Sequence, residues 1–465
     1  GGAIGSAFIP TFAAYFERDD EPGGWRLFSA VVNLTLLVVT AVSLLTFLFA
    51  EPFVAFFLRD LVAGQPELLS LTVRLMRLML LSPIIFGASG VIMGTLNARQ
   101  HFLLPALAPI VYNLGIIGGA VLWGAPDDPE AKAVGMAVGT VVGALGHLLV
   151  QLPGLRQKGA RYSPVLTLRD PGVRQVLRLM APRVLGLSFS EINKFATLFL
   201  SGLMTAASYP ALILAWRVMI MPQGILGQAM GTAAFPTLAS LAARKALAEM
   251  RQILADALRM LLFLGLPATA LLMTLGRPAV GVLFERGLFD ATDTALVAWA
   301  LLFYAVGLVA LTALEVIARA FYALNDTLTP VLAGGVQIGL MFGFSYWLSQ
   351  GIFPRLGWPA LGGLALGHSL SNVLEVALLL WLLRRKMRGL NGRVLLSGGW
   401  RMLAAALLAA AASWAAVRWL ADAAALWQLL LGSLAGGAAY LVGCYALRVK
   451  EVQWLLQLGR RVVKR

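Results

Sequence analysis

The sequence predicts an all-α polytopic membrane protein. Two six-helix lobes form a parallel repeat around a central cavity, two C-terminal helices follow, and the first helix is missing from this chain. Three observations predict this fold. Of the 465 residues, 59% are apolar and only 13% are charged, with a mean hydropathy of +0.82, whereas soluble domains are about 25% charged. Apolar stretches of membrane-spanning length recur, and short motifs repeat 225 or 226 positions apart.

Twelve stretches are long and apolar enough to cross the hydrocarbon core, which takes about 20 residues of helix. In chain order these are Leu27–Ala50, Leu78–Ala98, Phe102–Pro126, Ala133–Leu155, Leu179–Leu203, Thr205–Pro236, Met260–Gly276, Thr294–Leu324, Leu328–Pro354, Leu356–Leu383, Met402–Leu420 and Ala423–Leu447. Gly1–Phe16 is apolar but shorter, and it lacks the basic region of a signal peptide. We read it as the end of a thirteenth helix.

Lysine and arginine are distributed unevenly between alternate loops. One side of the membrane receives 25 of them and the other receives 8. The positive-inside rule therefore places the basic side, and with it the C-terminus, in the cytoplasm. The net charge of +15 is spread over separate loops, which favours anionic lipid headgroups as counter-charges and argues against nucleic acid.

The two halves of the chain share short motifs in the same order. Pro10 and Pro236 lie in similar segments 226 positions apart, and Leu104-Pro105 corresponds to Thr329-Pro330 at a spacing of 225. Six spans separate equivalent positions, so the halves have the same orientation, as in transporters that rock two lobes around a midplane site. By this symmetry the first lobe needs a complete helix before Gly1.

The repeat and the charge pattern set the expected domain boundaries. They are 1–155 for the incomplete N-terminal lobe, 156–175 for a basic cytoplasmic linker, 176–384 for the C-terminal lobe, 385–401 for a basic cytoplasmic loop, 402–447 for the two extra helices and 448–465 for a basic cytoplasmic tail.

Arg217 is the strongest candidate for a substrate-binding residue. A charge inside a span costs about 2.5–3.5 kcal/mol and by default indicates function. No acidic residue lies within four positions of Arg217, and Pro222 and several glycines follow it. An unpaired guanidinium in such a helix suits a water-filled cavity that receives an anion such as a phosphate. The alternative is a structural ion pair with a distant carboxylate.

Other ionisable residues in the spans are candidates for the cavity or for gating. Glu191 and Lys194 are spaced to pair on one helix face, as are Glu315 and Arg319, which would then brace a helix end. Arg183 follows a proline near the cytoplasmic end, where it could extend to the interface. Two further residues are Glu375 and His368, which together could carry a coupling proton.

Motifs for catalysis and metal binding are absent from the sequence. It has no phosphate-binding GxxxxGK[ST] loop, no HExxH and no EF-hand loop. One cysteine and three scattered histidines exclude a thiolate or histidine-rich metal cluster. We therefore expect neither an enzyme nor a bound cofactor.

Several motifs resemble those of the MurJ/MviN lipid II flippases of the multidrug/oligosaccharidyl-lipid/polysaccharide exporter superfamily. Ala3–Tyr15 is similar to E-G-A-x-x-x-A-F-V-P-x-x-A-x-Y, and Leu96–Asn113 to L-N-x-x-x-x-F-x-x-P-A-x-x-P-x-x-x-N. Ala215–Pro222 resembles A-x-R-L-x-x-x-P, Phe284–Phe289 resembles F-x-x-G-x-F, and Arg319–Pro330 resembles R-A-F-Y-A-x-x-D-T-x-T-P. These motifs cover nearly the whole chain.

The resemblance implies a 14-helix flippase that moves undecaprenyl-pyrophosphate-linked lipid II across the bacterial inner membrane for peptidoglycan synthesis. It implies a cationic cavity containing Arg217 and a lipid-tail groove formed by the helices in 402–447. Its partners would be lipid II, anionic membrane lipids and cell-wall synthesis proteins. Coupling to a monovalent cation or to the membrane potential is left open, because Thr197 and Ser345 are uncharged at the family's suggested sodium site.

Two other functions compete with this one. A cation-coupled multidrug or other polysaccharide-lipid exporter of the same superfamily would need carboxylates in the cavity and would have twelve spans. A membrane glycosyltransferase would need a cluster of acidic residues or histidines at one interface, and the sequence shows none.

Overall fold

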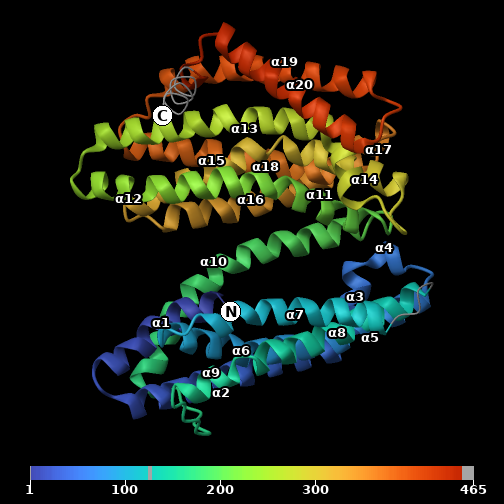
Figure 1. Ribbon diagram of the computed structural model, residues 1–465. Coiled ribbons are helices and arrows are strands. Elements are labelled where there is room, and N and C mark those ends of the chain that lie inside the picture. The colour runs from blue at the N-terminus through green and yellow to red at the C-terminus, as the bar shows by residue number, and fades with distance from the viewer. Residues whose placement is uncertain (1, 124–127, 453–465) are drawn as a thin grey trace, which may run out of the picture. The chain divides into compact units, whose positions relative to one another are not determined.

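Figure 1 shows the computed structural model of the chain, which describes residues 2–123 and 128–452. The chain forms two compact units, Gly1–Glu191 and Ile192–Arg465. All regular secondary structure in the described residues is helical.

Unit 1 consists of nine helices and the first part of a tenth, within its described residues. They are α1 (Gly2–Glu17), α2 (Glu21–Leu48), α3 (Ala50–Phe57), α4 (Arg59–Val62), α5 (Pro66–Met79), α6 (Leu81–Ala98), α7 (Leu103–Leu122), α8 (Pro129–Leu149), α9 (Leu152–Gln157) and α10 (Pro171–Ser201). The boundary between the units falls within α10.

Aromatic side chains fill the contact between α1 and α2 in unit 1. The rings of Phe8 and Phe12 stack with centroids 5.1 Å apart, and the Phe12 ring meets the edge of Trp25 at 5.6 Å. Trp25 also contacts Phe28, and all four side chains are buried. Edge-to-face aromatic pairs add about 0.5–1.5 kcal/mol each to the energy of burial.

Unit 2 contains the remaining described helices. They are α11 (Ser208–Gln223), the π-helix η1 (Gly224–Gln228), α12 (Ala229–Ala243), α13 (Leu247–Phe284), α14 (Ala291–Ala305), α15 (Leu308–Ala323), α16 (Leu328–Tyr346), the π-helix η2 (Trp347–Ile352), α17 (Phe353–Arg355), α18 (Ala360–Lys386), α19 (Gly392–Trp419) and α20 (Ala425–Ala446).

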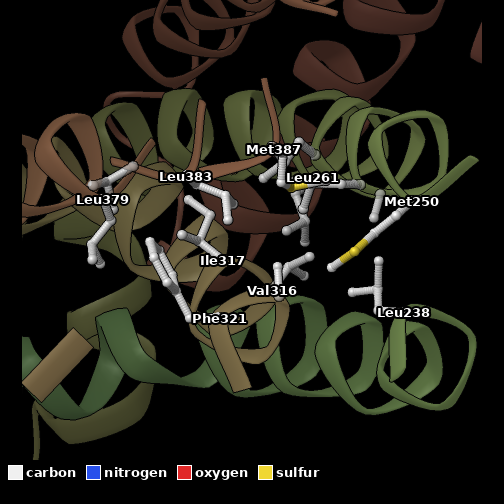
Figure 2. Packing of buried hydrophobic residues seen from close by; sticks show 14 of the residues in the cluster. Leu238, Met250, Leu261, Val316, Ile317, Phe321, Leu379, Leu383 and Met387 are labelled. Atoms are coloured by element: carbon white, nitrogen blue, oxygen red, sulfur yellow. The ribbon is translucent and has the colours of Figure 1, made fainter. Parts of the chain in front are cut away.

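Figure 2 shows the largest apolar cluster of unit 2, where α12, α13, α15 and α18 meet. Leu238 of α12 and Met250 of α13 lie at one end, and Phe321 of α15 and Leu379 of α18 lie at the other. These side chains are at most 1% exposed. The cluster holds the helices in a fixed arrangement, which is the scaffold for the polar residues described below.

The last two helices pack on α13. Buried residues from the three helices form one apolar cluster with Val449 and Val452, which follow α20. Beside it, Arg259 of α13 makes a two-pronged ion pair with Glu451, at 2.7 Å from Nε and 3.1 Å from Nη2. This paired contact fixes the start of the C-terminal segment against the unit.

The expected internal repeat is visible in the backbone. Asp19 after α1 and Lys245 after α12 both have left-handed φ, at 56° and 57°. The residue that follows closes the turn in the same way in both places. The N–H of Asp20 donates to the carbonyl of Tyr15 and the N–H of Ala246 donates to the carbonyl of Leu241, both at 2.9 Å. These are the same helix-ending motif, and the positions are 226 apart.

A second helix end repeats at the other predicted spacing. Gln100 before α7 and Asn325 before α16 have φ of 56° and 58°. The N–H of His101 donates to Leu96 O at 2.9 Å, and the N–H of Asp326 donates to Phe321 O at 3.0 Å. The structure therefore confirms the repeat locally, at the two places where the motifs predicted it.

Of the twelve predicted spans, ten or eleven correspond to helices that are long and apolar enough to cross a membrane, judged by length and composition within the described residues. The number is eleven if α14 and α15, which bend by 46°, count as one broken span. The stretch Leu179–Leu203 is not among them. It lies in α10, which is 31 residues long, and Arg183, Glu191 and Lys194 lower the mean hydropathy of this stretch.

Some helix bounds differ from those that charge and hydropathy predict. The single span expected at Thr294–Leu324 is broken between Ala305 and Leu308. Helix α19 begins at Gly392, inside the segment 385–401 expected to be a loop. Positive charges mark the membrane surface, and a helix can continue past that surface into water.

Candidate substrate-binding residues

The segment that carries Arg217 is an interrupted helix. Pro222 lies inside α11, and its ring removes one backbone hydrogen bond. The π-helical turn η1 follows at once, and α12 contains a second proline, Pro236. Such π-turns are frequent at functional sites because they redirect side chains on either side.

Arg217 lies on the exposed side of α11, and its neighbours in sequence are packed inward. Val218 and Met219 are buried, and the ring of Trp216 lies against His368 of α18 at 4.8 Å. Within the described part of the chain, no side chain forms a hydrogen bond or ion pair with Arg217. The structure thus offers no support for the alternative of a structural ion pair there.

Glu315 and Arg319 form the ion pair that their spacing predicts. Arg319 Nη1 donates to Glu315 Oε2 at 2.6 Å and to the Glu315 carbonyl at 2.7 Å. Gln223 at the end of α11 donates to the other carboxylate oxygen at 3.3 Å. Both charged side chains remain about a quarter exposed, at 23% and 28%, so the pair keeps access to solvent.

Glycines on the interrupted helix let α15 approach closely. A Cβ on Gly231 would collide with the guanidinium of Arg319, and one on Gly227 would lie 3.1 Å from the Cα of Thr312. Beside this contact, Glu315 and Arg319 line a pocket of about 380 Å³ with Phe235 and Tyr322, among others. The pair therefore faces a hollow next to α12.

The other predicted site residues lie on α10. Glu191 and Lys194 are both exposed, and the boundary between the two units falls between them. Arg183 is on the same helix, and its side chain lies outside the described residues. Lys194 does not line the Glu315–Arg319 pocket, because the residues that line it come from α12 and α15.

Polar residues that the sequence did not single out, Asn193, Gln337, Ser371 and Asn372, lie near Glu375 in the interior of unit 2. Asn193 of α10 donates to Gln337 of α16 at 3.2 Å, and Gln337 donates to Ser371 of α18 at 3.0 Å. Asn372 and Glu375 lie on the same helix and are also buried. Their spacing along α18 was the available signal, because polar residues three and four positions apart share a helix face.

No cofactor site is apparent among the described residues. No group of three or more His, Cys, Asp or Glu side chains there could hold a metal ion. Among the described residues, Arg217 is an exposed cation without a partner and Glu315–Arg319 is an ion pair that keeps access to solvent.

Comparison with known proteins gives a consistent result. The family model described as lipid II flippase MurJ matches residues 1–437. The chain is 29% identical over 393 residues to the probable lipid II flippase MurJ of Vibrio cholerae, which covers 81% of this chain and 71% of that protein. It is 28% identical over 342 residues to the lipid II flippase MurJ of Burkholderia cenocepacia, covering 72% of this chain and 66% of that protein.

Solved structures share the fold. The chain superimposes on a lipid II flippase MurJ in an inward closed conformation with a TM-score of 0.74 at 22% identity, covering 96% of this chain and 88% of that one. An inward-facing multidrug resistance MATE family transporter of the MOP superfamily gives a TM-score of 0.68 at 15% identity, covering 84% and 87%. The fold is thus common to both kinds of transporter.

Proposed function

Since the chain belongs to the MurJ family of lipid II flippases, we propose that it carries lipid II across the membrane by alternating access, for cell-wall synthesis. The family is one of transporters, and this chain is a multi-pass protein of the bacterial inner membrane. The substrate would be an undecaprenyl-pyrophosphate-linked glycan, which combines a doubly charged anionic linker with a long apolar tail.

The observation that carries the proposal is the exposed Arg217 on an interrupted helix, which has no partner among the residues that the structure describes. A guanidinium binds phosphate oxygens through two parallel hydrogen bonds, and charge-assisted bonds are about twice as strong as neutral ones. Arginine also stays protonated in a low-dielectric cavity. Arg217 would therefore hold the pyrophosphate while the sugars and the lipid tail cross.

The remaining candidates would act around this contact. Glu315 and Arg319 would open and close the pocket beside α12, because the pair can exchange its internal ion pair for one with a charged substrate. Glu191, Lys194 and Arg183 on α10 would line the path of the headgroup. The groove for the lipid tail would lie along the two helices of 402–447.

The test is transport of labelled lipid II by purified protein in liposomes. Arg217→Ala should abolish transport while leaving accumulation and thermal stability unchanged, because no described residue depends on Arg217 as a partner. Arg217→Lys keeps the charge but loses the planar fork, so transport should be low or intermediate. The matched control is Arg355→Ala, which removes an exposed arginine on α17.

Either of two results would contradict this role. If Arg217→Ala fails to accumulate or melts early, the residue is structural, since loss of one partner of a buried ion pair costs about 3–5 kcal/mol. If Arg217→Ala transports normally and is stable, the pyrophosphate binds elsewhere.

A second candidate function is a cation-coupled exporter of drugs or other polysaccharide lipids, which the similarity to a MATE transporter favours. It predicts efflux of cationic compounds in the same liposomes. Transport of lipid II without such efflux would exclude it.

We also propose the orientation and the partners of the chain. The C-terminal tail would be cytoplasmic, with anionic lipids facing its basic loops and cell-wall synthesis proteins as further partners. A monovalent cation or the membrane potential would supply energy. Labelling of Lys158→Cys or Lys450→Cys by an impermeant reagent outside intact cells, in a Cys444→Ala background, would overturn the orientation.

A further inference from the structure

Helix α18 carries a stripe of buried polar residues through the interior of unit 2. His368, Ser371, Asn372 and Glu375 are spaced by three or four positions and so share one face. Their exposed fractions are between 0% and 9%. In a helix that is otherwise apolar and long enough to span the membrane, four such residues on one face need a physical explanation.

Two of the four residues have neighbours that explain part of the stripe. Ser371 accepts a hydrogen bond from Gln337 and donates to the carbonyl of His368. The ring of His368 lies edge-on to Trp216 and to Tyr304 of α14, at 4.8 and 5.7 Å. Glu375 stands apart, because no described residue makes a hydrogen bond or ion pair with its carboxyl group.

The carboxyl group of Glu375 points toward α16. Its Oε1 lies 3.7 Å from the position that a Cβ on Gly334 would occupy. Val376 and Leu379, next to it on α18, belong to the apolar cluster of Figure 2. Glu375 itself is 8% exposed, so the group is largely removed from water.

Charged and titratable groups on the surrounding helices do not reach it. Glu315 and Arg319 of α15 pair with each other on the side that faces α12. The only titratable residue of α16 is Tyr346 at its end. Tyr304 of α14 and His368 of α18 contact each other. Arg217 of α11 and Lys194 of α10 are exposed, as is Glu191.

An ionised carboxylate in this place would be strongly unfavourable. Moving an isolated charge into a low-dielectric interior is so costly that the group takes up a proton instead. No group of three or more His, Cys, Asp or Glu side chains among the described residues could hold a metal ion, and the sodium arm of the experiment below distinguishes a proton from a cation held by amide and hydroxyl oxygens. A proton requires only the one carboxyl group.

Unsatisfied polar atoms lie around the stripe. Asn193 Oδ1, His368 Nδ1 and Asn372 Nδ2 are buried and have no hydrogen-bond partner. Such atoms favour entry of water when the helices separate. Water would then solvate the carboxylate and make release of its proton favourable.

We propose that Glu375 is a proton-binding site whose occupancy changes during transport. When no water lies along the buried polar face of α18, Glu375 is a neutral carboxylic acid. When α16 and α18 part and water enters, the O–H bond breaks, the proton goes to water and the carboxylate remains, hydrated. When α16 and α18 come together again and water leaves, the carboxylate takes up a proton from water. Coupling of this step to lipid II movement rests on the proposed function, but proton binding does not.

Infrared spectroscopy of the purified protein tests the proton site directly. Wild type at neutral pH should show the carbonyl stretch of a protonated carboxylic acid, and Glu375→Gln should lose it. Glu375→Asp keeps a carboxyl group and should show the band at a shifted frequency. This variant is the control for loss of the band through misfolding. Asp422→Asn, which changes an exposed carboxylate in the loop before α20, should leave the band unchanged. A wild-type spectrum without the band, or one that Glu375→Gln leaves intact, overturns the proposal.

Transport in liposomes then tests the coupling. Wild type should move lipid II at a rate that depends on pH, and Glu375→Gln should lose that dependence because it cannot release a proton. An identical pH profile in both proteins shows that the neutral carboxyl is only structural and overturns the coupling. A profile that changes with sodium at fixed pH assigns the site to a metal cation instead. A wild type with the band but without transport refutes the proposed function and leaves the proton site standing.

Discussion

Two helical hairpins follow the repeated helix ends, α7 with α8 in unit 1 and α16 with α18 in unit 2, and their interiors differ. Between α7 and α8 the backbones touch, because a Cβ on Gly119 would collide with the carbonyl of Gly135. Between α16 and α18 such a contact is found at Gly367, which faces Ser345, and elsewhere these two helices bury polar residues such as Gln337 and Ser371 beside apolar ones.

Both units contain buried polar atoms without partners, but their buried titratable side chains inside the helices differ. In unit 1, His147 Nδ1 lies 2.7 Å from Ser89 Oγ, and the Gln151 amide donates to the same hydroxyl at 2.8 Å. In unit 2, Glu375 has no partner among the described residues. The repeated backbone thus supports a closely packed interface between α7 and α8 in one copy, and an interface with buried polar residues between α16 and α18, the polar seam, in the other. Duplication of a fold preserves its turns but not the chemistry of its interfaces.

The largest expected effect concerns the glycine contact of unit 1. Gly119→Leu should destabilise the protein by at least about 3 kcal/mol, the upper end of overpacking costs, because the opposing atoms are backbone and cannot move aside. Accumulation in membranes and the melting temperature of purified protein measure this. The control is Gly118→Leu on the same helix, where a Cβ meets nothing within 4 Å. Equal behaviour of the two variants would show that α7 and α8 are not closely packed.

A smaller effect should follow from changing the polar seam of unit 2. Gln337→Leu leaves Asn193 and Ser371 without their shared partner, and a buried unsatisfied group costs about 1–3 kcal/mol. The melting temperature should fall, although α16 and α18 remain apolar enough to insert. Val336→Leu, at the exposed neighbouring position, serves as the control. A Gln337→Leu protein as stable as wild type would mean that these hydrogen bonds contribute nothing to the seam.

The smallest effect should come from the repeated loops. Asp326 pairs with Lys386 at 2.7 Å, whereas His101, at the equivalent place in unit 1, has a buried Nε2 without a partner. Burial opposes ionisation of Asp326, but hydrogen bonds from Lys386 and Thr329 outweigh it and lower its pKa to about 2. Because Lys386 is 40% exposed, the pair should contribute about 1 kcal/mol or less.

The sign of the pH dependence follows from the lowered pKa of Asp326. An unfolded aspartate has a pKa of about 3.9, so the stabilisation is fully present above that pH and is lost as pH falls toward 2. Asp326→Asn should therefore melt slightly earlier than wild type at pH 5–7, and the gap should close below pH 4. A gap that stays constant with pH would remove the ion pair as its cause.

Much of the architecture was predictable from local sequence. Runs of apolar residues identified the spans because insertion depends on summed hydropathy, and the motifs around Pro10 and Pro236 identified the repeat because similar turns need similar residues. The pairing of Glu315 with Arg319 was predictable for the same reason, since four positions fix their distance on a helix. Leu179–Leu203 lies almost wholly in the long helix α10, as a span requires, but its charged residues keep it outside the helices that meet the length and hydropathy criterion.

The sequence by itself determined the membrane class, the repeat, the family resemblance and the candidacy of Arg217, because each depends on residues close together in the chain. Only the tertiary structure decided that Arg217 has no partner among the described residues, that Asn193, Gln337 and Ser371 are bonded in series, and that Glu375 is buried beside Gly334. Those facts depend on which helices are neighbours. Hydropathy is a sum along one helix and contains no information about the helix opposite.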